Sequence, residues 1–136
     1  MQTQKILVID DDEMLRMLLS FKLSALGYEV SFAEDGKHGI ELAQEISPDL
    51  IVLDGMMPVM DGVETIKRLK ADDTLKTIPV VMLTARRGDA DAVQALSLGA
   101  IDFVNKPFNP EELVLRIQRH IQNSGDSAPD RQQASF

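Results

Sequence analysis

The chain has 136 residues, enough for one domain and a short tail but too few for two full domains. Its hydrophobic share of 44% and charged share of 26% are ordinary for a globular domain. The lack of cysteine excludes disulfides, thiolate metal sites and thiol catalysis, and it fits a reducing, cytoplasmic location. No apolar run approaches the roughly 20 residues that span a bilayer, and a net charge of −8 argues against nonspecific binding to nucleic acid or to an anionic membrane.

The first third of the chain predicts two strands with a helix between them. Lys5–Ile9 is apolar almost throughout, as in a strand of a parallel sheet that helices cover on both faces. An apolar stripe with helical spacing then predicts the buried face of a helix that stops at Gly27; its members are Met14, Leu18, Phe21 and Ala25. Tyr28–Phe32 alternates apolar and polar residues, which predicts a half-covered edge strand.

The middle of the chain repeats the alternation of helix and strand. Leu50–Leu53 and Ile78–Leu83 are continuous apolar runs that predict two more buried strands. Each follows a helical stripe, and the first stripe ends at Pro48. The two stripes are Ile40, Ala43 and Ile46, and then Val63, Ile66 and Leu69.

The last third predicts a weak helix, a strand, a strong helix and a tail. Val93 and Leu96 form a weak stripe, and Ala100–Val104 is another apolar run. A helix capped at Asn109 follows, with a stripe formed by Leu113, Ile117 and Ile121. Five strands and five helices predict one doubly wound α/β domain over residues 1–122, with helices on both faces of a parallel sheet. Residues 123–136 are polar and aperiodic, and we expect a disordered tail or linker there.

Chemically active side chains follow four of the predicted strands. Asp10 and Asp11 follow the first, Asp54 the third, Thr84 the fourth and Lys106 the fifth. Ligands of an open parallel sheet bind beyond the carboxyl ends of its strands. We therefore expect a single site, provided that the first and third strands are neighbours.

Carboxylates gathered at one point need a cation. Two of them about 4 Å apart repel by about 4 kcal/mol at an effective dielectric constant of ~20. Magnesium binds such oxygens together with water and phosphate oxygens, and a carboxylate can serve as the nucleophile of phosphoryl transfer. Taken singly, each residue also has a simpler explanation, such as a helix cap for Asp12 and Glu13, a turn for Asp54 or a solvated charge for Lys106.

Four motifs, in order along the chain, resemble the CheY-like receiver domain of two-component response regulators over about residues 4–122. They are ILVIDDDE at 6–13, DLIVLDGMMPVMDG at 49–62, PVVMLTAR at 79–86 and GAIDFVNKPF at 99–108. The resemblance implies a flavodoxin-like fold with strand order 2-1-3-4-5. It also implies a phosphorylation-controlled signalling switch that is not an enzyme of metabolism.

The resemblance assigns roles to the site residues. Asp54 matches the phosphoryl acceptor, Asp11 the direct ligand of Mg²⁺ (or Mn²⁺), and Asp10 the acid that acts through water. Met56 matches the position whose backbone carbonyl completes the metal site.

Four further residues match the parts of the family that respond to the phosphoryl group. Thr84 and Lys106 match the phosphate-sensing hydroxyl and the phosphate-pairing lysine, and the Lys106–Pro107 peptide bond is expected to be cis. Phe103 matches an aromatic switch position, although core packing explains it equally well. We expect phosphorylation to change the surface made by the fourth helix, the fifth strand and the fifth helix.

The implied partners are a histidine kinase or histidine phosphotransfer protein and a downstream output domain or protein. No nucleic acid or membrane is expected to bind this domain directly. A phosphorylation-dependent homodimer is a further implication, because Asp102, Glu112 and Arg116 match positions that pair across subunits in related transcription regulators. The predicted fourth helix, residues 88–98, has no Lys or Arg, so part of that charge pattern is missing.

Three alternatives compete with the switch. A haloacid-dehalogenase-like phosphatase would also use an aspartate nucleophile, but it needs an acid two residues later, where this chain has Met56. A flavodoxin-like cofactor carrier needs a phosphate-binding loop after the first strand, where Asp10 and Asp11 would repel phosphate. A receiver relic used only for docking would have no reason to keep the full set of site residues.

Overall fold

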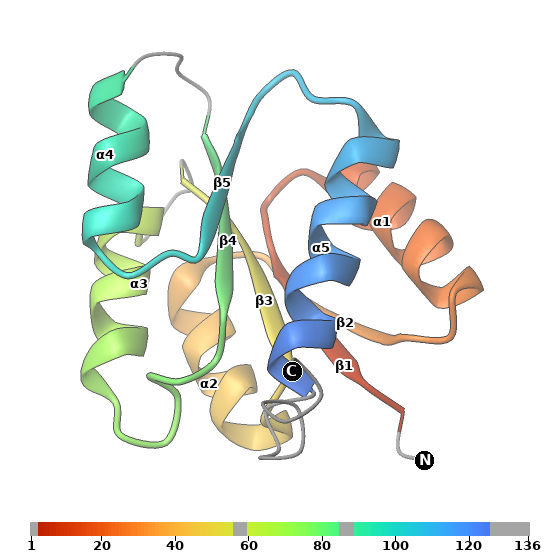
Figure 1. Ribbon diagram of the computed structural model, residues 1–136. Coiled ribbons are helices and arrows are strands. Elements are labelled where there is room, and N and C mark those ends of the chain that lie inside the picture. Colours follow the sequence, from red (N-terminus) through yellow and green to blue (C-terminus); the bar gives the residue numbers. More distant parts are fainter. Residues whose placement is uncertain (1–2, 56–59, 85–88, 126–136) are drawn as a thin grey trace, which may run out of the picture.

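The computed structural model describes residues 3–55, 60–84 and 89–125. Strands and helices alternate through these segments (Figure 1). The strands are β1 (Lys5–Ile9), β2 (Glu29–Ala33), β3 (Leu50–Asp54), β4 (Val80–Thr84) and β5 (Asp102–Asn105). The helices are α1 (Glu13–Ala25), α2 (Gly36–Ile46), α3 (Gly62–Ala71), α4 (Asp89–Ser97) and α5 (Pro110–Gly125).

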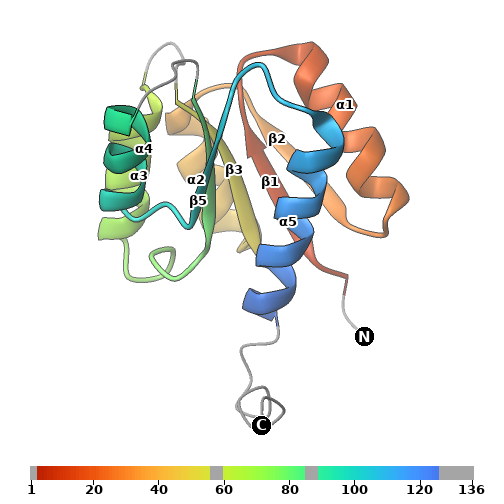
Figure 2. The ribbon, with the colours of Figure 1, turned by 45° about the horizontal axis from the view of Figure 1, so that its top comes forward.

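The five strands form one parallel sheet in the order β2-β1-β3-β4-β5. Helices α1 and α5 cover one face, and α2, α3 and α4 cover the other (Figures 1 and 2). The predicted doubly wound fold and its strand order are confirmed. In this order β1 and β3 are neighbours, which meets the condition for a single site at the carboxyl ends of the strands.

The sheet separates two hydrophobic clusters. On β1, Ile6 and Val8 pack into the cluster of α1 and α5, whereas Leu7 and Ile9 pack into the cluster of α2, α3 and α4. This alternation follows from the two-residue period of a strand, and it explains why the central strands are apolar at every position. β2 lies at an edge and is only half-buried, as its alternating sequence predicts.

Helix ends are defined by local hydrogen bonds. Asp12, Asp35 and Asp61 accept backbone N–H groups in the first turns of α1, α2 and α3, and Asn109 does the same for α5. Gly27 lies just beyond α1 with a φ of 97°, a left-handed conformation that favours glycine. The predicted stop at Gly27 and the predicted cap at Asn109 are therefore both present.

The predicted inner face of α1 is wrong. The residues that enter the core are Leu15, Leu19 and Leu23, whereas Met14 and Phe21 are 79% and 75% exposed. Two apolar stripes with helical spacing lie side by side on this helix, so periodicity alone could not choose between them. The packing of the helix on the sheet decides which stripe is buried.

The prediction for α4 is also wrong, since Val93 and Leu96 are 63% and 47% exposed and the small Ala95 is buried instead. β5 forms the second edge of the sheet, and Ile101 just before it is 44% exposed although it belongs to the apolar run Ala100–Val104. An edge strand contacts a neighbour on one side only, so its apolar run does not imply full burial.

The carboxyl-terminal helix extends past the predicted boundary. The predicted stripe of Leu113, Ile117 and Ile121 is fully buried, and α5 continues to Gly125, three residues into the segment 123–136 expected to form the tail. The rest of that segment lies outside the described residues. Among the described residues, no helix is both long enough and apolar enough to span a membrane.

Candidate functional site

The carboxyl ends of β1 and β3 bring three aspartates together. Asp10 directly follows β1 and Asp54 is the last residue of β3, and the register pairs Ile9 with Leu53. Asp10 is fully buried, Asp54 is 2% exposed, and Asp11 is exposed. One carboxylate oxygen from each lies within 4.8 Å of the others, which is close enough for a shared cation.

The backbone at the start of α3 packs so closely against the backbone of Asp54 and Gly55 that a side chain at Gly62 would not fit. Gly55 N–H donates to the carbonyl of Leu83 at 2.8 Å, and Gly62 N–H donates to the carbonyl of Gly55 at 3.2 Å. A Cβ at Gly62 would lie 2.6 Å from the Asp54 carbonyl oxygen, so glycine is needed there. This close approach holds the first turn of α3 directly behind the candidate phosphoryl acceptor.

Asp10 is held in place by hydrogen bonds, but only one of its two carboxylate oxygens accepts one from the described residues. Its Oδ1 accepts the N–H of Asp12 at 2.8 Å, and its carbonyl oxygen accepts Nη1 of Arg16 at 2.8 Å. Its Oδ2 is buried and accepts no hydrogen bond from the described residues; Nζ of Lys106 is 3.8 Å away. Burial, reinforced by the charge of Asp54, raises the pKa of Asp10 from 3.8 to about 7, although the Asp12 N–H and Lys106 act in the opposite direction.

Lys106 reaches the aspartates from the end of β5. Its Nζ lies 3.3 Å from Oδ1 of Asp54, and its backbone N–H donates to the carbonyl of Thr84 at 2.7 Å. The peptide bond between Lys106 and Pro107 is cis. The side chain is 26% exposed, so the ammonium group lies at the boundary between the buried acids and solvent.

Thr84 is the last residue of β4, and it is 8% exposed. Its hydroxyl donates to Oδ1 of Asn105 at 2.6 Å, across the β4–β5 ladder that pairs the two residues. Phe103 is partly buried and packs against the cluster of α2, α3 and α4. It lies two residues before Asn105 and on the same face of the sheet.

These groups suit a divalent cation and a phosphoryl group. When all are ionised, three carboxylates and one ammonium leave two net negative charges, which a divalent cation balances. Oxygen ligands select a hard cation such as Mg²⁺, and Oδ2 of Asp10, which accepts no hydrogen bond from the described residues and lies 3.8 Å from Nζ of Lys106, would gain from a closer cation. The predicted fourth ligand, the carbonyl of Met56, lies outside the described residues.

Two residues of the site were missed in the sequence. Arg16, one turn into α1, supports the backbone of Asp10, and Asn105 binds the Thr84 hydroxyl. In the sequence, a basic residue five positions after Asp11 is only weak evidence for the role of Arg16, because the same helix also carries Lys22. Asn105 had no signal beyond its position next to Lys106.

A second charged cluster joins β5 to α5. Asp102 accepts Nη1 of Arg116 at 3.0 Å and Nε2 of His120 at 3.0 Å, and Nη2 of Arg116 also donates to Glu112 at 2.9 Å. The three residues expected to pair across a dimer, Asp102, Glu112 and Arg116, therefore pair within the chain.

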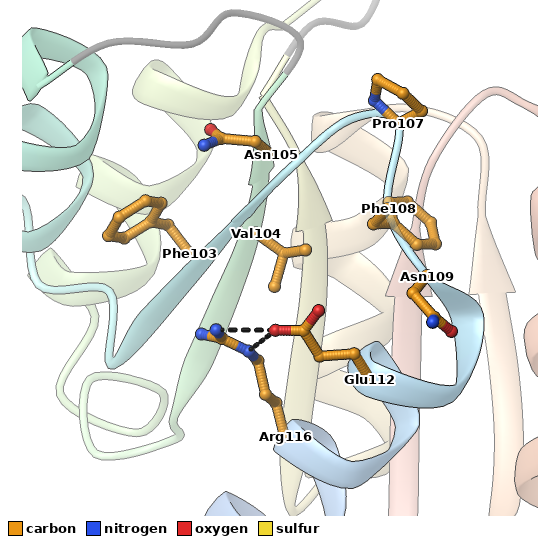
Figure 3. A pocket seen from close by; sticks show the side chains of 8 residues that line it. All are labelled: Phe103, Val104, Asn105, Pro107, Phe108, Asn109, Glu112 and Arg116. Atoms are coloured by element: carbon orange, nitrogen blue, oxygen red, sulfur yellow. Dashed lines mark hydrogen bonds and ion pairs between the residues drawn. The ribbon is translucent and has the colours of Figure 1, made fainter.

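A groove of about 290 Å³ lies between β5 and α5 beside this cluster (Figure 3). Glu112 and Arg116 bound it below, while Phe103 and Asn105 from β5 and Phe108 from the following loop also line it (Figure 3). The groove thus extends from the Thr84–Asn105 hydrogen bond to the charged cluster.

A parallel sheet in this order, with acids at the ends of β1 and β3 and a lysine after β5, defines a doubly wound α/β domain whose ligand site lies at the carboxyl ends of its strands. The model of the response regulator receiver domain family matches residues 6–118 of the chain. The chain belongs to this family. The match covers all five strands except Lys5 at the start of β1, and it favours a receiver domain over the phosphatase and flavodoxin-like alternatives.

Relatives agree in sequence and in structure. The chain is 41% identical over 126 residues to the alkaline phosphatase synthesis transcriptional regulatory protein PhoP of Bacillus subtilis, covering 93% of this chain and 52% of that protein. It is 39% identical to the DNA-binding response regulator MtrA of Mycolicibacterium smegmatis, covering 90% and 53%. The chemotaxis protein CheY4 of Vibrio cholerae superposes with a TM-score of 0.81 at 36% identity, covering 87% of this chain and 98% of the other. The chain spans about half the length of the curated relatives it matches.

Proposed function

We propose that Asp54 accepts a phosphoryl group from a phosphohistidine, with Mg²⁺ or Mn²⁺ bound beside it, and that this modification switches the protein between two signalling states. One observation carries the proposal: the buried Oδ2 of Asp10, which accepts no hydrogen bond from the described residues, lies in the same cluster as Asp54. A buried charge in this condition is costly unless a cation binds it.

The chain's own residues supply most of the chemistry. An oxygen of Asp54 attacks phosphorus in line, the bond from phosphorus to the histidine nitrogen breaks, and the imidazole keeps the electron pair. Lys106, already 3.3 Å from Asp54, pairs with the transferred oxygens, and Thr84 can donate its hydroxyl to one of them. A bound Mg²⁺ would be held by Asp10, Asp11 and Asp54 and would neutralise charge on the phosphoryl oxygens.

Intact mass spectrometry tests the proposal directly. The protein is incubated with a small phosphodonor such as acetyl phosphate, with Mg²⁺ or with EDTA. We expect a mass gain of one phosphoryl group that requires the metal and is absent in Asp54→Asn. A mass gain that persists in Asp54→Asn would refute the assignment of Asp54.

Asp12→Asn is the matched control. Asp12 lies in the same acidic loop, but its Oδ1 caps α1 by accepting the N–H groups of Met14 and Leu15 at 3.0 and 3.3 Å. Asparagine caps helices equally well, so this variant should still be phosphorylated. Asp11→Asn, which removes a proposed metal ligand, should need a much higher Mg²⁺ concentration.

Under this proposal the protein acts as a switch and does not turn over a substrate, and it is located in the cytoplasm. Uptake should stop at one phosphoryl group per chain, whereas continuous hydrolysis of phosphate esters would indicate a phosphatase. The donor would be a histidine kinase or histidine phosphotransfer protein, and the output a further domain or protein that binds the surface of α4, β5 and α5. For a homodimer through this surface, the exposed Leu96 and Ile101 offer apolar contacts, and Arg116 pairs with Asp102 and Glu112 within the chain.

A further inference from the structure

We infer that Asn105 holds the Thr84 hydroxyl in the unphosphorylated state, and that the phosphoryl group on Asp54 must displace Asn105 from this bond. The inference rests on the proposed function and adds a residue that sets the balance between its two states. Asn105 acts through Thr84, so it is a positioning residue and does not touch the phosphoryl group.

The bond between the two side chains is short. Thr84 Oγ1 donates to Asn105 Oδ1 at 2.6 Å, and the parallel register places the two residues directly opposite each other at the ends of β4 and β5. The next residue, Lys106, bonds the carbonyl of Thr84 through its own backbone N–H at 2.7 Å. The end of β5 therefore holds Thr84 through both its side chain and its backbone.

The Thr84 hydroxyl has only one proton to donate, so Asn105 and a phosphoryl group on Asp54 compete for it. While the Thr84 proton is given to Asn105, it cannot be given to an oxygen on Asp54. Asp54 ends β3, the strand next to β4, so a phosphoryl group there competes for the same proton. The position of the Thr84 hydroxyl therefore depends on whether Asp54 is phosphorylated.

Release of Asn105 changes a surface that a partner can contact. Asn105 is an exposed residue at the end of β5, and with Phe103 and Phe108 it lines the groove between β5 and α5 (Figure 3). Phe103 lies on the same face of the sheet, two residues before Asn105. Breaking the bond frees Oδ1 of Asn105 to accept a hydrogen bond from a molecule in the groove, which connects the phosphorylation site with this surface.

A double-mutant cycle with beryllofluoride as the phosphoryl mimic tests the inference. The apparent dissociation constant in the presence of Mg²⁺ is measured for the wild type, Asn105→Ala, Thr84→Val and the double variant. Loss of a competing hydrogen bond should make Asn105→Ala bind the mimic about five-fold more tightly. In the Thr84→Val background the same substitution should change nothing, because valine has no hydroxyl to release.

Two further variants separate this role from a general effect on the groove. Asn105→Asp keeps an acceptor at the same place, so it should not tighten binding. Asn109→Ser removes the other amide that lines the groove but keeps a capping oxygen for the N–H of Glu111, and it should leave the dissociation constant within two-fold of the wild type.

The outcomes distinguish this inference from the proposed function. If the wild type does not bind beryllofluoride or take up a phosphoryl group, the proposed function is wrong and the role of Asn105 fails with it. If the wild type binds but Asn105→Ala has the same effect with and without the Thr84 hydroxyl, only the role of Asn105 is overturned. Tighter binding by Asn105→Asp would also overturn it.

Discussion

Asp10 directly follows strand β1 and Asp102 is the first residue of strand β5 in the same sheet, but the surroundings of the two carboxylates differ. Asp10 is fully buried, has one unsatisfied oxygen among the described residues, and has a pKa raised to about 7 by burial. The side chain of Asp102 is 17% exposed and accepts hydrogen bonds from Arg116, from His120 and from the N–H of Phe103. Burial alone would raise the pKa of Asp102, but these donors outweigh it and the pKa is lowered.

The difference teaches how to tell a ligand site from a structural network. The fold supplies Asp102 with donors, so that carboxylate stabilises the junction between β5 and α5. It leaves Asp10 short of donors, so that carboxylate costs free energy until a cation or a proton arrives. The clearest tests of this contrast are substitutions that remove the charge of each aspartate while keeping the shape of its side chain.

Asp10→Asn should have the largest effect and in two opposite directions. The free energy of unfolding without metal should rise by about 2 kcal/mol, since a buried and poorly paired charge is removed. The affinity for Mg²⁺ should fall at least about tenfold because a charged ligand is lost. Urea denaturation with EDTA and with Mg²⁺ measures both, and a less stable metal-free variant would contradict the contrast.

Asp102→Asn should have the opposite sign. It removes the negative charge and one of the two acceptor oxygens that Arg116 and His120 share, and both of these side chains are partly buried, at 34% and 16% exposure. We expect the free energy of unfolding to fall by about 1–2 kcal/mol while the affinity for Mg²⁺ stays unchanged. The same denaturation and metal titrations apply, and a loss of metal affinity would show that the two regions are coupled.

The two carboxylates should also give opposite pH dependence. Between pH of about 4 and about 7 the folded, metal-free protein keeps a proton on Asp10 that the unfolded chain releases, so stability falls as pH rises, by at most about 1.4 kcal/mol per pH unit. Asp102, with its lowered pKa, adds stability above a pH of about 4 that is lost on acidification. Denaturation of the wild type and Asp10→Asn from pH 4.5 to 8 isolates the first contribution, and parallel curves would disprove it.

His120→Gln should have the smallest effect. Glutamine can still donate to Asp102, but its amide replaces a ring that lies 3.0 Å from Oδ2, and we expect a loss of about 0.5 kcal/mol. NMR titration of the Asp102 carboxyl carbon should show a pKa closer to its ordinary value. If that pKa does not move, Arg116 and the backbone alone hold the carboxylate.

The sequence predicted the sheet better than the helix faces. Continuous apolar runs such as Leu50–Leu53, alternating with helical stripes, predicted a doubly wound sheet with helices on both faces, whereas the strand order followed from the resemblance to receiver domains. The face of α1 did not follow, because the stripe through Leu15 and the stripe through Met14 are both apolar and both have helical spacing. Packing against the sheet, which involves residues far away in the chain, made the choice.

The candidate site was predictable where its residues follow strands and unpredictable where they act in support. Asp10, Asp54 and Lys106 stand at strand ends, and the rule for parallel sheets brings them together. Asn105 and Arg16 contribute through single hydrogen bonds whose geometry exists only in the folded protein. The roles of Met56 as a metal ligand and of Phe103 as a switch stay predictions.

The division of the interior by the sheet has a consequence for how substitutions combine. Leu7 and Val8 are adjacent in the chain but belong to different hydrophobic clusters, so the energetic effects of shortening both should be nearly additive. Val8 and Ile117 are distant in the chain but share a cluster, so a cavity at one site changes the cost of a cavity at the other. Epistasis in this domain should therefore follow the two faces of the sheet rather than distance along the sequence.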